Sequence, residues 1–100
     1  MIRKVVISKT TEKKLDALFS YLVEKWSTKV KNEFIEKLDY SIQLIRNQPE
    51  MFPESKQGKK LRKCVVTKHT TLFYRCTTKK INVVTIFETR QNAKKLKKDI

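Results

Sequence analysis

The chain has 100 residues, of which 39% are hydrophobic, which is enough for one packed core but not for two. One glycine and two prolines leave little room for flexible linkers, so we expect a single domain over residues 1–100. No apolar run approaches the ~18 residues of a membrane span, and the first residues lack the apolar segment of a signal peptide. The sequence therefore argues against a membrane partner and predicts a cytoplasmic protein.

The positive charge is concentrated in the second half of the chain. Residues 1–54 carry 10 basic and 8 acidic side chains, whereas residues 55–100 carry 14 basic and 2 acidic ones, within a formal net charge of +14. A field of this sign attracts polyanions, which include nucleic acid, acidic proteins and anionic membrane faces, and raises the rate at which they are encountered. We therefore expect a negatively charged partner, such as nucleic acid or an acidic protein.

The N-terminal half predicts a strand followed by a helix. Residues 4–8 are short and β-branched, as strands are. Thr10 or Thr11 is the candidate N-cap of the helix that follows. The apolar stripe of this helix has the spacing of one helix face and consists of Leu15, Leu18, Phe19, Leu22, Val23 and Trp26. We expect the whole stripe to pack in the core.

A second helix is predicted to begin after Ser27, a favoured N-cap residue, and to end before Pro49. Its apolar positions recur about every four residues and are Val30, Phe34, Leu38, Ile42 and Ile45. The two helices are joined almost without a loop. We therefore expect an antiparallel helix hairpin.

Three strands are predicted at residues 61–66, 71–76 and 81–87, and the short connectors at 67–70 and 77–80 imply an antiparallel meander. The last strand carries apolar groups on both faces, so we expect it to be central. Its two predicted faces are Ile81, Val83, Thr85 and Phe87 on one side and Asn82, Val84 and Ile86 on the other. The expected fold class is α+β, with the helix hairpin packed on the sheet and a short basic C-terminal tail.

Cys64 and Cys76, with the lone His69, are too few ligands for a structural zinc ion. If the strands around them pair as a hairpin centred near Thr70, the two thiols face each other across strands, which would permit a disulfide. The interpretation that we favour is that both are reduced thiols buried as small apolar groups.

Two sequence runs carry a family resemblance. The first is Leu72-Phe73-Tyr74-Arg75, which follows a basic strand, and the second is the ending Ile86-Phe87-Glu88-Thr89-Arg90-Gln91-Asn92. With the order of elements, these runs resemble the ParE branch of the RelE/ParE toxins of type II toxin-antitoxin systems, of the plasmid-stabilisation type. The resemblance covers nearly the whole chain. It departs at Ala93, where this branch often has proline, and this difference loosens the turn into the tail.

The resemblance implies a toxin that inhibits DNA gyrase by binding, without catalysing a reaction, and that a cognate acidic antitoxin holds inactive in a hetero-oligomer. We expect no cofactor and no metal site. The alternative on the same fold is a mRNA endonuclease that depends on the ribosome, with ribosome and mRNA as partners. A simple nucleic-acid-binding module is a third interpretation, which is weaker because Phe19, Trp26 and Phe34 lie on predicted core stripes.

Cleavage of mRNA requires a base for the 2′-hydroxyl, a cation beside the phosphorane and a proton donor for the leaving oxygen. If the chain is a ribonuclease, the candidates are His69, Tyr74 and Arg90. His69 lies in a predicted connector, Tyr74 is expected in or beside the core, and Arg90 is equally suited to an ion pair with Glu88. Leu96 stands where the resemblance places the catalytic tyrosine. The preferred interpretation therefore has no catalytic residue.

Candidate residues for binding the target or the antitoxin are the basic side chains of the second half. They are Lys59, Lys60, Arg62, Lys63, Lys68, Arg75, Arg90, Lys94, Lys95, Lys97 and Lys98. Lysines on an edge strand also discourage aggregation, so a run of charge alone does not identify a site. The coincidence of this run with Lys79, Lys80 and the lysine-rich tail in one half of the chain is what favours binding.

Overall fold

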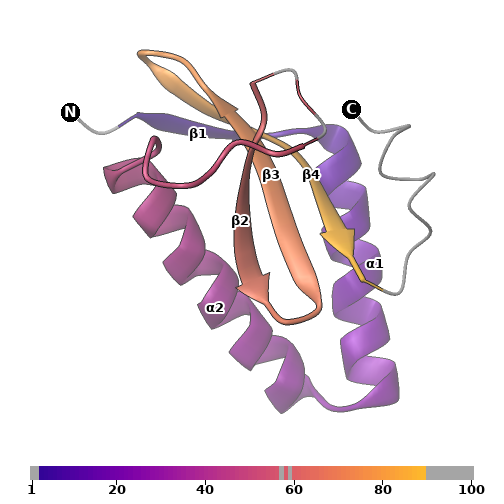
Figure 1. Ribbon diagram of the computed structural model, residues 1–100. Coiled ribbons are helices and arrows are strands. Elements are labelled where there is room, and N and C mark those ends of the chain that lie inside the picture. Colours follow the sequence, from indigo (N-terminus) through magenta and orange to yellow (C-terminus); the bar gives the residue numbers. More distant parts are fainter. Residues whose placement is uncertain (1–2, 57, 59, 90–100) are drawn as a thin grey trace.

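The computed structural model describes residues 3–56, 58 and 60–89. In this part of the chain, two helices pack against a four-stranded sheet (Figure 1). The elements in chain order are β1 (Lys4–Ile7), α1 (Lys9–Lys25), α2 (Thr28–Asn47), β2 (Arg62–Thr67), β3 (Thr70–Cys76) and β4 (Lys80–Glu88). The predicted α+β class and the predicted order of elements are confirmed.

The sheet has the strand order β1-β4-β3-β2. β2, β3 and β4 form the predicted antiparallel meander, and β1 lies parallel to β4, with Val5 opposite Ile81. β4 is therefore central, as predicted. β1 and β2 are the two edge strands.

The first helix begins earlier than the sequence predicts. Its N-cap is Ser8, not Thr10 or Thr11, and the Ser8 Oγ accepts a 3.1 Å hydrogen bond from the Thr11 amide. The Ser8 hydroxyl also donates to the carbonyl of Val84 at 2.8 Å, which fixes the start of α1 to β4. The cap is thus defined by a tertiary contact as well as by local preference.

The two helices form the predicted hairpin, and the Ser27 Oγ accepts a hydrogen bond from the Val30 amide at 3.1 Å as the cap of α2. The prediction for Trp26 was wrong, because its side chain is 66% exposed. α1 ends at Lys25, and Trp26 has φ −127° and ψ −89°, so its side chain no longer follows the helical stripe. Val23, one turn earlier, is also exposed.

The main core lies between the helices and the sheet. It joins buried residues of α2 to buried residues of the meander, namely Phe34, Leu38, Ile45, Cys64, Leu72, Tyr74, Ile81, Val83 and Ile86. A smaller cluster is formed by Leu61 and Phe73, with Val84 and Phe87 packed against them.

The predicted faces of β4 were therefore wrong at its C-terminal end. The pairing with β3 shifts between Phe73, which lies opposite Thr85, and Tyr74, which lies opposite Val83. This bulge leaves one extra residue in β4 and reverses the alternation beyond it. As a result Ile86 joins the main core with Val83, and Phe87 packs in the smaller cluster.

The helix hairpin extends beyond the β2–β3 turn (Figure 1). α1 packs against β4 and α2 packs against β2, while the two helices contact each other near their short connection. A groove lies between the helix hairpin and the turn.

Candidate functional site

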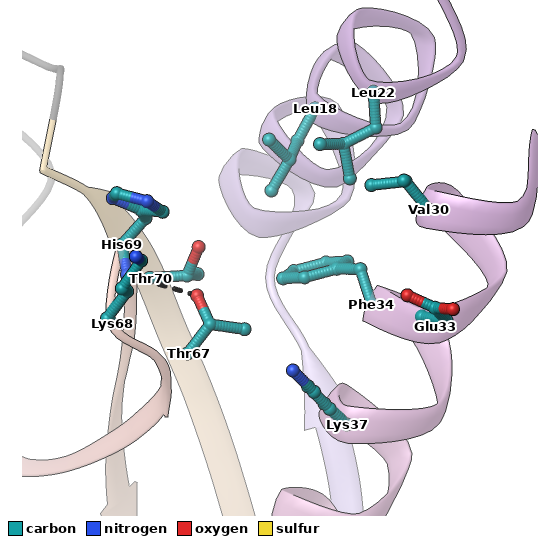
Figure 2. Close-up of a pocket in the computed structure, with 10 residues that line it drawn as sticks. All are labelled: Leu18, Leu22, Val30, Glu33, Phe34, Lys37, Thr67, Lys68, His69 and Thr70. Atoms are coloured by element: carbon teal, nitrogen blue, oxygen red, sulfur yellow. Dashed lines mark hydrogen bonds between the residues drawn. The ribbon is translucent and has the colours of Figure 1, made fainter. Parts of the chain in front are cut away.

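A groove of about 460 Å³ lies between the helix hairpin and the β2–β3 turn (Figure 2). One wall consists of helical side chains, and the other is the turn at residues 67–70. The lining residues are Leu18 and Leu22 from α1, Val30, Glu33, Phe34 and Lys37 from α2, and Thr67, Lys68, His69 and Thr70 from the turn.

The helical wall of the groove is mainly apolar, and most of its apolar side chains pack in or against the core. Phe34 is buried, and its ring meets that of Phe19 edge-on with centroids 6.1 Å apart. Leu18 and Leu22 are half-buried and pack against the same core. This wall is part of the folded core, so it offers a preformed apolar surface to a partner.

The opposite wall is polar and held in place by the end of β4. The amide of Thr89 donates a 2.7 Å hydrogen bond to the carbonyl of His69, and the His69 amide donates to Thr67 Oγ1 at 3.1 Å. The His69 ring Nδ1 lies 3.5 Å from Thr89 Oγ1. His69 is exposed, as the sequence predicted for a connector histidine.

The charged side chains at the groove are mainly basic. Lys37 of α2 and Lys68 of the turn are both exposed, and Glu33 is the acidic residue among those that line it. An apolar wall flanked by lysines suits a partner segment that has apolar anchors and acidic flanks.

Tyr74 is fully buried, which confirms that it packs in the core. Its hydroxyl donates a 2.6 Å hydrogen bond to the carbonyl of Pro49, and its ring contacts Phe52 edge-on with centroids 6.3 Å apart. Burial raises the pKa of the Tyr74 hydroxyl above its ordinary value, while the charge of Arg62 acts in the opposite direction.

The candidates for ribonuclease chemistry are not gathered at one place. Tyr74 lies opposite Arg62 at the start of β2, whereas His69 lies in the turn at the other end of β2 and β3. At ~3.3 Å per residue, the five residue steps between them correspond to roughly 17 Å along the strand. Arg90 lies outside the described residues, so this assignment stays a prediction.

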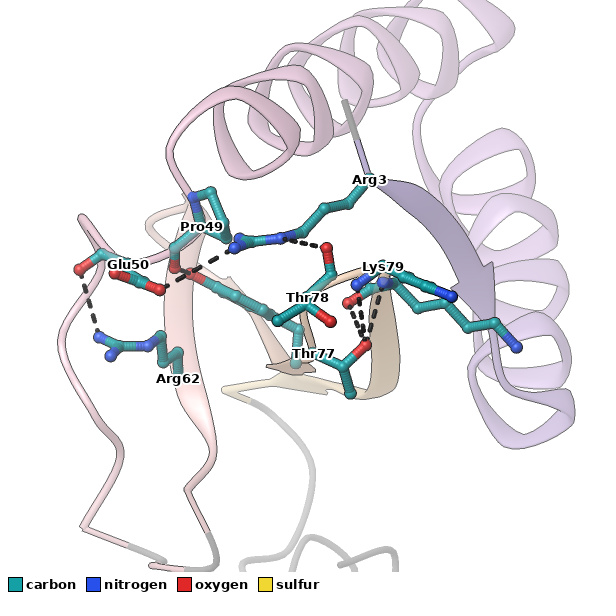
Figure 3. A network of polar contacts seen from close by, with 9 residues as sticks. Arg3, Pro49, Glu50, Arg62, Thr77, Thr78 and Lys79 are labelled. Atoms are coloured by element: carbon teal, nitrogen blue, oxygen red, sulfur yellow. Dashed lines mark hydrogen bonds and ion pairs between the residues drawn. The ribbon is translucent and has the colours of Figure 1, made fainter. Parts of the chain in front are cut away.

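Arg62 holds the loop that follows α2. Its Nη1 donates to the carbonyl oxygen of Phe52 at 2.6 Å. The same Nη1 donates to the carbonyl oxygen of Glu50 at 3.3 Å (Figure 3). The amide of Lys63 donates to the carbonyl of Pro53 at 3.1 Å, so this loop also covers the outer edge of β2 at its start. Arg62 therefore has a structural role in addition to any role in binding.

The other predicted binding residues are distributed over several places. Lys60 is exposed with a φ of 58°, and Lys63 is exposed on β2. Lys68 lies at the groove, and Arg75 is half-buried opposite Asn82. The remaining predictions lie outside the described residues, and they are Lys59, Arg90, Lys94, Lys95, Lys97 and Lys98.

The two thiols do not face each other. Cys64 lies opposite Leu72 in the β2–β3 pair, and Cys76 lies opposite Ile81 in the β3–β4 pair. The β2–β3 hairpin is centred between Lys68 and His69 and not near Thr70. Its register therefore differs from the one that would place Cys64 opposite Cys76. Both cysteines are free, and burial raises the pKa of the Cys64 thiol against an opposing hydrogen bond from Ser41. In the described part of the chain, no three His, Cys, Asp or Glu side chains gather as metal ligands.

The sequence did not identify the apolar wall of the groove. Leu18, Leu22, Val30 and Phe34 have the spacing of core residues. Phe34 is in the core and Leu18 and Leu22 pack against it, while Val30 is half-buried at the groove. Nothing in that spacing distinguishes a stripe that is fully covered from one whose end projects beyond the sheet. The predicted helices are much longer than the predicted strands, and this difference could have indicated that the helices extend beyond the sheet.

Comparison with known proteins agrees with this architecture. Residues 5–93 match the family described as ParE toxin of type II toxin-antitoxin system, parDE. No curated protein matches the chain. No described helix is both long and apolar enough to cross a membrane.

Several solved structures share the fold. The chromosomal ParDE toxin-antitoxin system from P. aeruginosa matches with a TM-score of 0.75 and 10% identity, over 89% of this chain and 98% of that chain. The E. coli DinJ-YafQ toxin-antitoxin complex matches with a TM-score of 0.59 and 19% identity, over 88% and 93%. A copper-bound mutant toxin from Helicobacter pylori matches with a TM-score of 0.56 and 16% identity, over 88% and 94%.

Proposed function

We propose that this chain, which belongs to the ParE toxin family of type II toxin-antitoxin systems, inhibits DNA gyrase by binding it and is held inactive by an acidic antitoxin. The groove supports the antitoxin part of the proposal. It has a volume of about 460 Å³, and in it a mainly apolar helical wall faces a turn that carries a lysine. The solved structures with this fold include toxin-antitoxin complexes.

The antitoxin segment that suits the groove is an amphipathic helix. Its apolar anchors, spaced about three or four residues apart, would contact Leu22, Val30 and Phe34, and its acidic flank would lie near Lys37 and Lys68. Such a segment combines apolar affinity with charge steering.

The edge of β2 offers a second mode, in which the antitoxin adds a strand. The loop at residues 53–55 already covers the start of this edge, through the bond from Lys63 to Pro53 and the one from the Ser55 amide to the Leu61 carbonyl. These two bonds reach β2 no further than Lys63, so the stretch available to an added strand is the C-terminal half of β2, where Val65 is 64% exposed. This stretch is short, and we therefore favour the groove as the main docking site.

The gyrase part of the proposal rests on family membership and on the poor suitability of the side chains for catalysis. Tyr74 is buried and engaged by Pro49, and His69 is exposed in a turn whose position depends on Thr89. Neither arrangement provides a base and an acid on either side of a phosphate. Inhibition by binding requires neither.

The test compares the two candidate targets directly. Purified toxin is added to a gyrase supercoiling assay and to a translating ribosome extract in which mRNA ends are mapped by primer extension. We expect loss of supercoiling without new mRNA ends, and recovery of supercoiling when the antitoxin is added. Codon-phased mRNA ends with unaffected supercoiling would instead identify the ribosome-dependent endonuclease.

A further inference from the structure

A second group of basic side chains lies at the end of the sheet away from the groove, and the proposed function makes no use of it. Arg3 precedes β1, Lys4 begins β1, and Lys79 and Lys80 lie at the β3–β4 turn. The parallel pairing sets Lys4 opposite Lys80, and the Lys4 amide donates to the Lys79 carbonyl at 3.0 Å. We call these four residues the β1 corner.

The backbone that carries the two turn lysines is ordered by Thr77. The Thr77 amide donates to the Lys80 carbonyl at 2.8 Å, and the Thr77 Oγ1 accepts from the amides of Lys79 and Lys80 at 3.3 and 3.0 Å (Figure 3). The lysines therefore extend from a fixed turn. Less conformational entropy is lost when a partner binds to such a turn than when it binds to a flexible loop.

Arg3 is held at the same corner by weak contacts. Its Nε donates to the carbonyl of Thr78 at 3.4 Å, and its Nη2 lies 4.0 Å from Glu50 Oε1 (Figure 3). The Glu50 side chain is 73% exposed, so solvent screens this pair. Among the described residues, Lys4, Lys79 and Lys80 make no ion pair, and all three are exposed.

The chemistry of the corner favours phosphate. Four cations and one weakly held carboxylate leave an excess of positive charge, and threonine hydroxyls accompany it at the turn. Lysine, arginine and threonine are among the side chains that contact phosphate oxygens in DNA complexes. None of the four described residues that define the corner is aromatic or apolar, so these side chains offer neither a surface on which an unpaired base could stack nor an apolar anchor for a peptide.

We propose that the β1 corner binds the phosphate backbone of duplex DNA, independently of its sequence. Duplex DNA carries one negative charge per ~1.7 Å of its axis, so several phosphates fall within reach of a corner of this size. The inference goes beyond gyrase inhibition, because it concerns binding of DNA by the toxin itself.

The test measures binding of the full chain to a labelled duplex of about 20 base pairs, by fluorescence anisotropy between about 50 and about 200 mM salt. The variant is Lys79→Ser with Lys80→Ser. The matched control is Lys25→Ser with Lys29→Ser, which removes the same charge from two exposed lysines at the helix connection. Circular dichroism checks that all three proteins are folded.

We expect the slope of log K against log salt to become shallower by about 2 in the corner variant, since each phosphate contact contributes about 0.9. The control should keep the wild-type slope. Equal slopes in the two variants, or no DNA binding by the wild type, would overturn the proposal. No gyrase is present, so these outcomes leave the proposed function untouched.

A second arm uses poly-glutamate of matched charge in place of DNA. If the corner recognises a phosphate backbone, the corner variant should lose more affinity for DNA than for the acidic polypeptide. A larger loss for poly-glutamate would assign the corner to an acidic protein and contradict the inference.

Discussion

The hydroxyl of Tyr74 donates a 2.6 Å hydrogen bond to the carbonyl of Pro49, just beyond the end of α2. Both residues are buried, and Phe52 packs edge-on against the Tyr74 ring. Arg62 binds the carbonyl oxygens of Glu50 and Phe52 a few residues further on. Side chains of β2 and β3 therefore hold the loop after α2 through three of its carbonyl groups.

Replacement of Tyr74 by phenylalanine should destabilise the fold. The carbonyl of Pro49 would lose its donor while staying buried, and an unsatisfied buried polar group costs about 1–3 kcal/mol. For a chain of this size, each ~1 kcal/mol lowers the melting temperature by about 4–8 °C. Thermal and urea unfolding of the purified variant measure the effect.

The matched control is Tyr40→Phe, because Tyr40 is 66% exposed on α2. Its stability should stay within about 0.5 kcal/mol of the wild type. A Tyr74→Phe protein with unchanged stability but abolished toxicity would contradict the structural role and favour a role in chemistry.

The raised pKa of Tyr74 predicts a pH dependence of stability. The folded state favours the neutral phenol, so this group stabilises the fold below its ordinary pKa of 10.0. The stabilisation is lost as the pH rises above that value, because the unfolded chain ionises first. The urea midpoint should fall more steeply above pH ~10 in the wild type than in Tyr74→Phe. Parallel curves would show that Tyr74 does not carry the effect.

Local pattern predicted much of the fold, and tertiary contacts account for what it missed. The stripe of α2 and the Ser27 cap depend on residues close in sequence, and both were predicted. The Ser8 cap depends partly on Val84, and the reversed face of Phe87 depends on a bulge against β3. Neither of these contacts can be recognised from the residues that neighbour Ser8 or Phe87 in the sequence.

The candidate site was harder to predict, because the groove forms where the helix hairpin extends beyond the β2–β3 turn (Figure 1). Lys68 was predicted from its charge as a binding residue; it lines the groove, and its role in binding stays a prediction. Arg62 has the same charge, yet it binds backbone carbonyls of the loop after α2. The side chain alone cannot distinguish a cation that meets a partner from one that holds a loop.

Association with the cognate antitoxin should depend on salt in its rate. The lysines at the groove are exposed, and Debye screening shortens from about 10 Å at 0.1 M to about 3 Å at 1 M. The association rate constant, measured by stopped flow, should therefore fall over this range and should be lower for Lys68→Ser than for the control Lys25→Ser. An unchanged rate across the range would exclude steering.

The basic tail should contribute to toxicity without contributing to the fold. Truncation after Arg90, or replacement of Lys94, Lys95, Lys97 and Lys98 by serine, removes charge beyond the end of β4 at Glu88. We expect weaker target binding by ~1 kcal/mol or more, as for important interface groups. Growth inhibition and the unfolding midpoint are measured together. A loss of stability equal to the loss of binding would assign the tail to the fold.

Replacement of His69 by alanine separates the two mechanisms. If toxicity comes from binding gyrase, no side chain acts as a general base, and His69→Ala should inhibit growth nearly as well as the wild type. The Thr89 amide bonds to the His69 backbone carbonyl, so the turn should keep its position in the variant. A ribonuclease would instead lose roughly 10²- to 10⁴-fold in rate, with mRNA cuts disappearing in step. Induced cells are assayed for the DNA-damage response and for transcript ends. We expect DNA damage with intact transcripts, and codon-phased cleavage that precedes any damage would refute gyrase as the target.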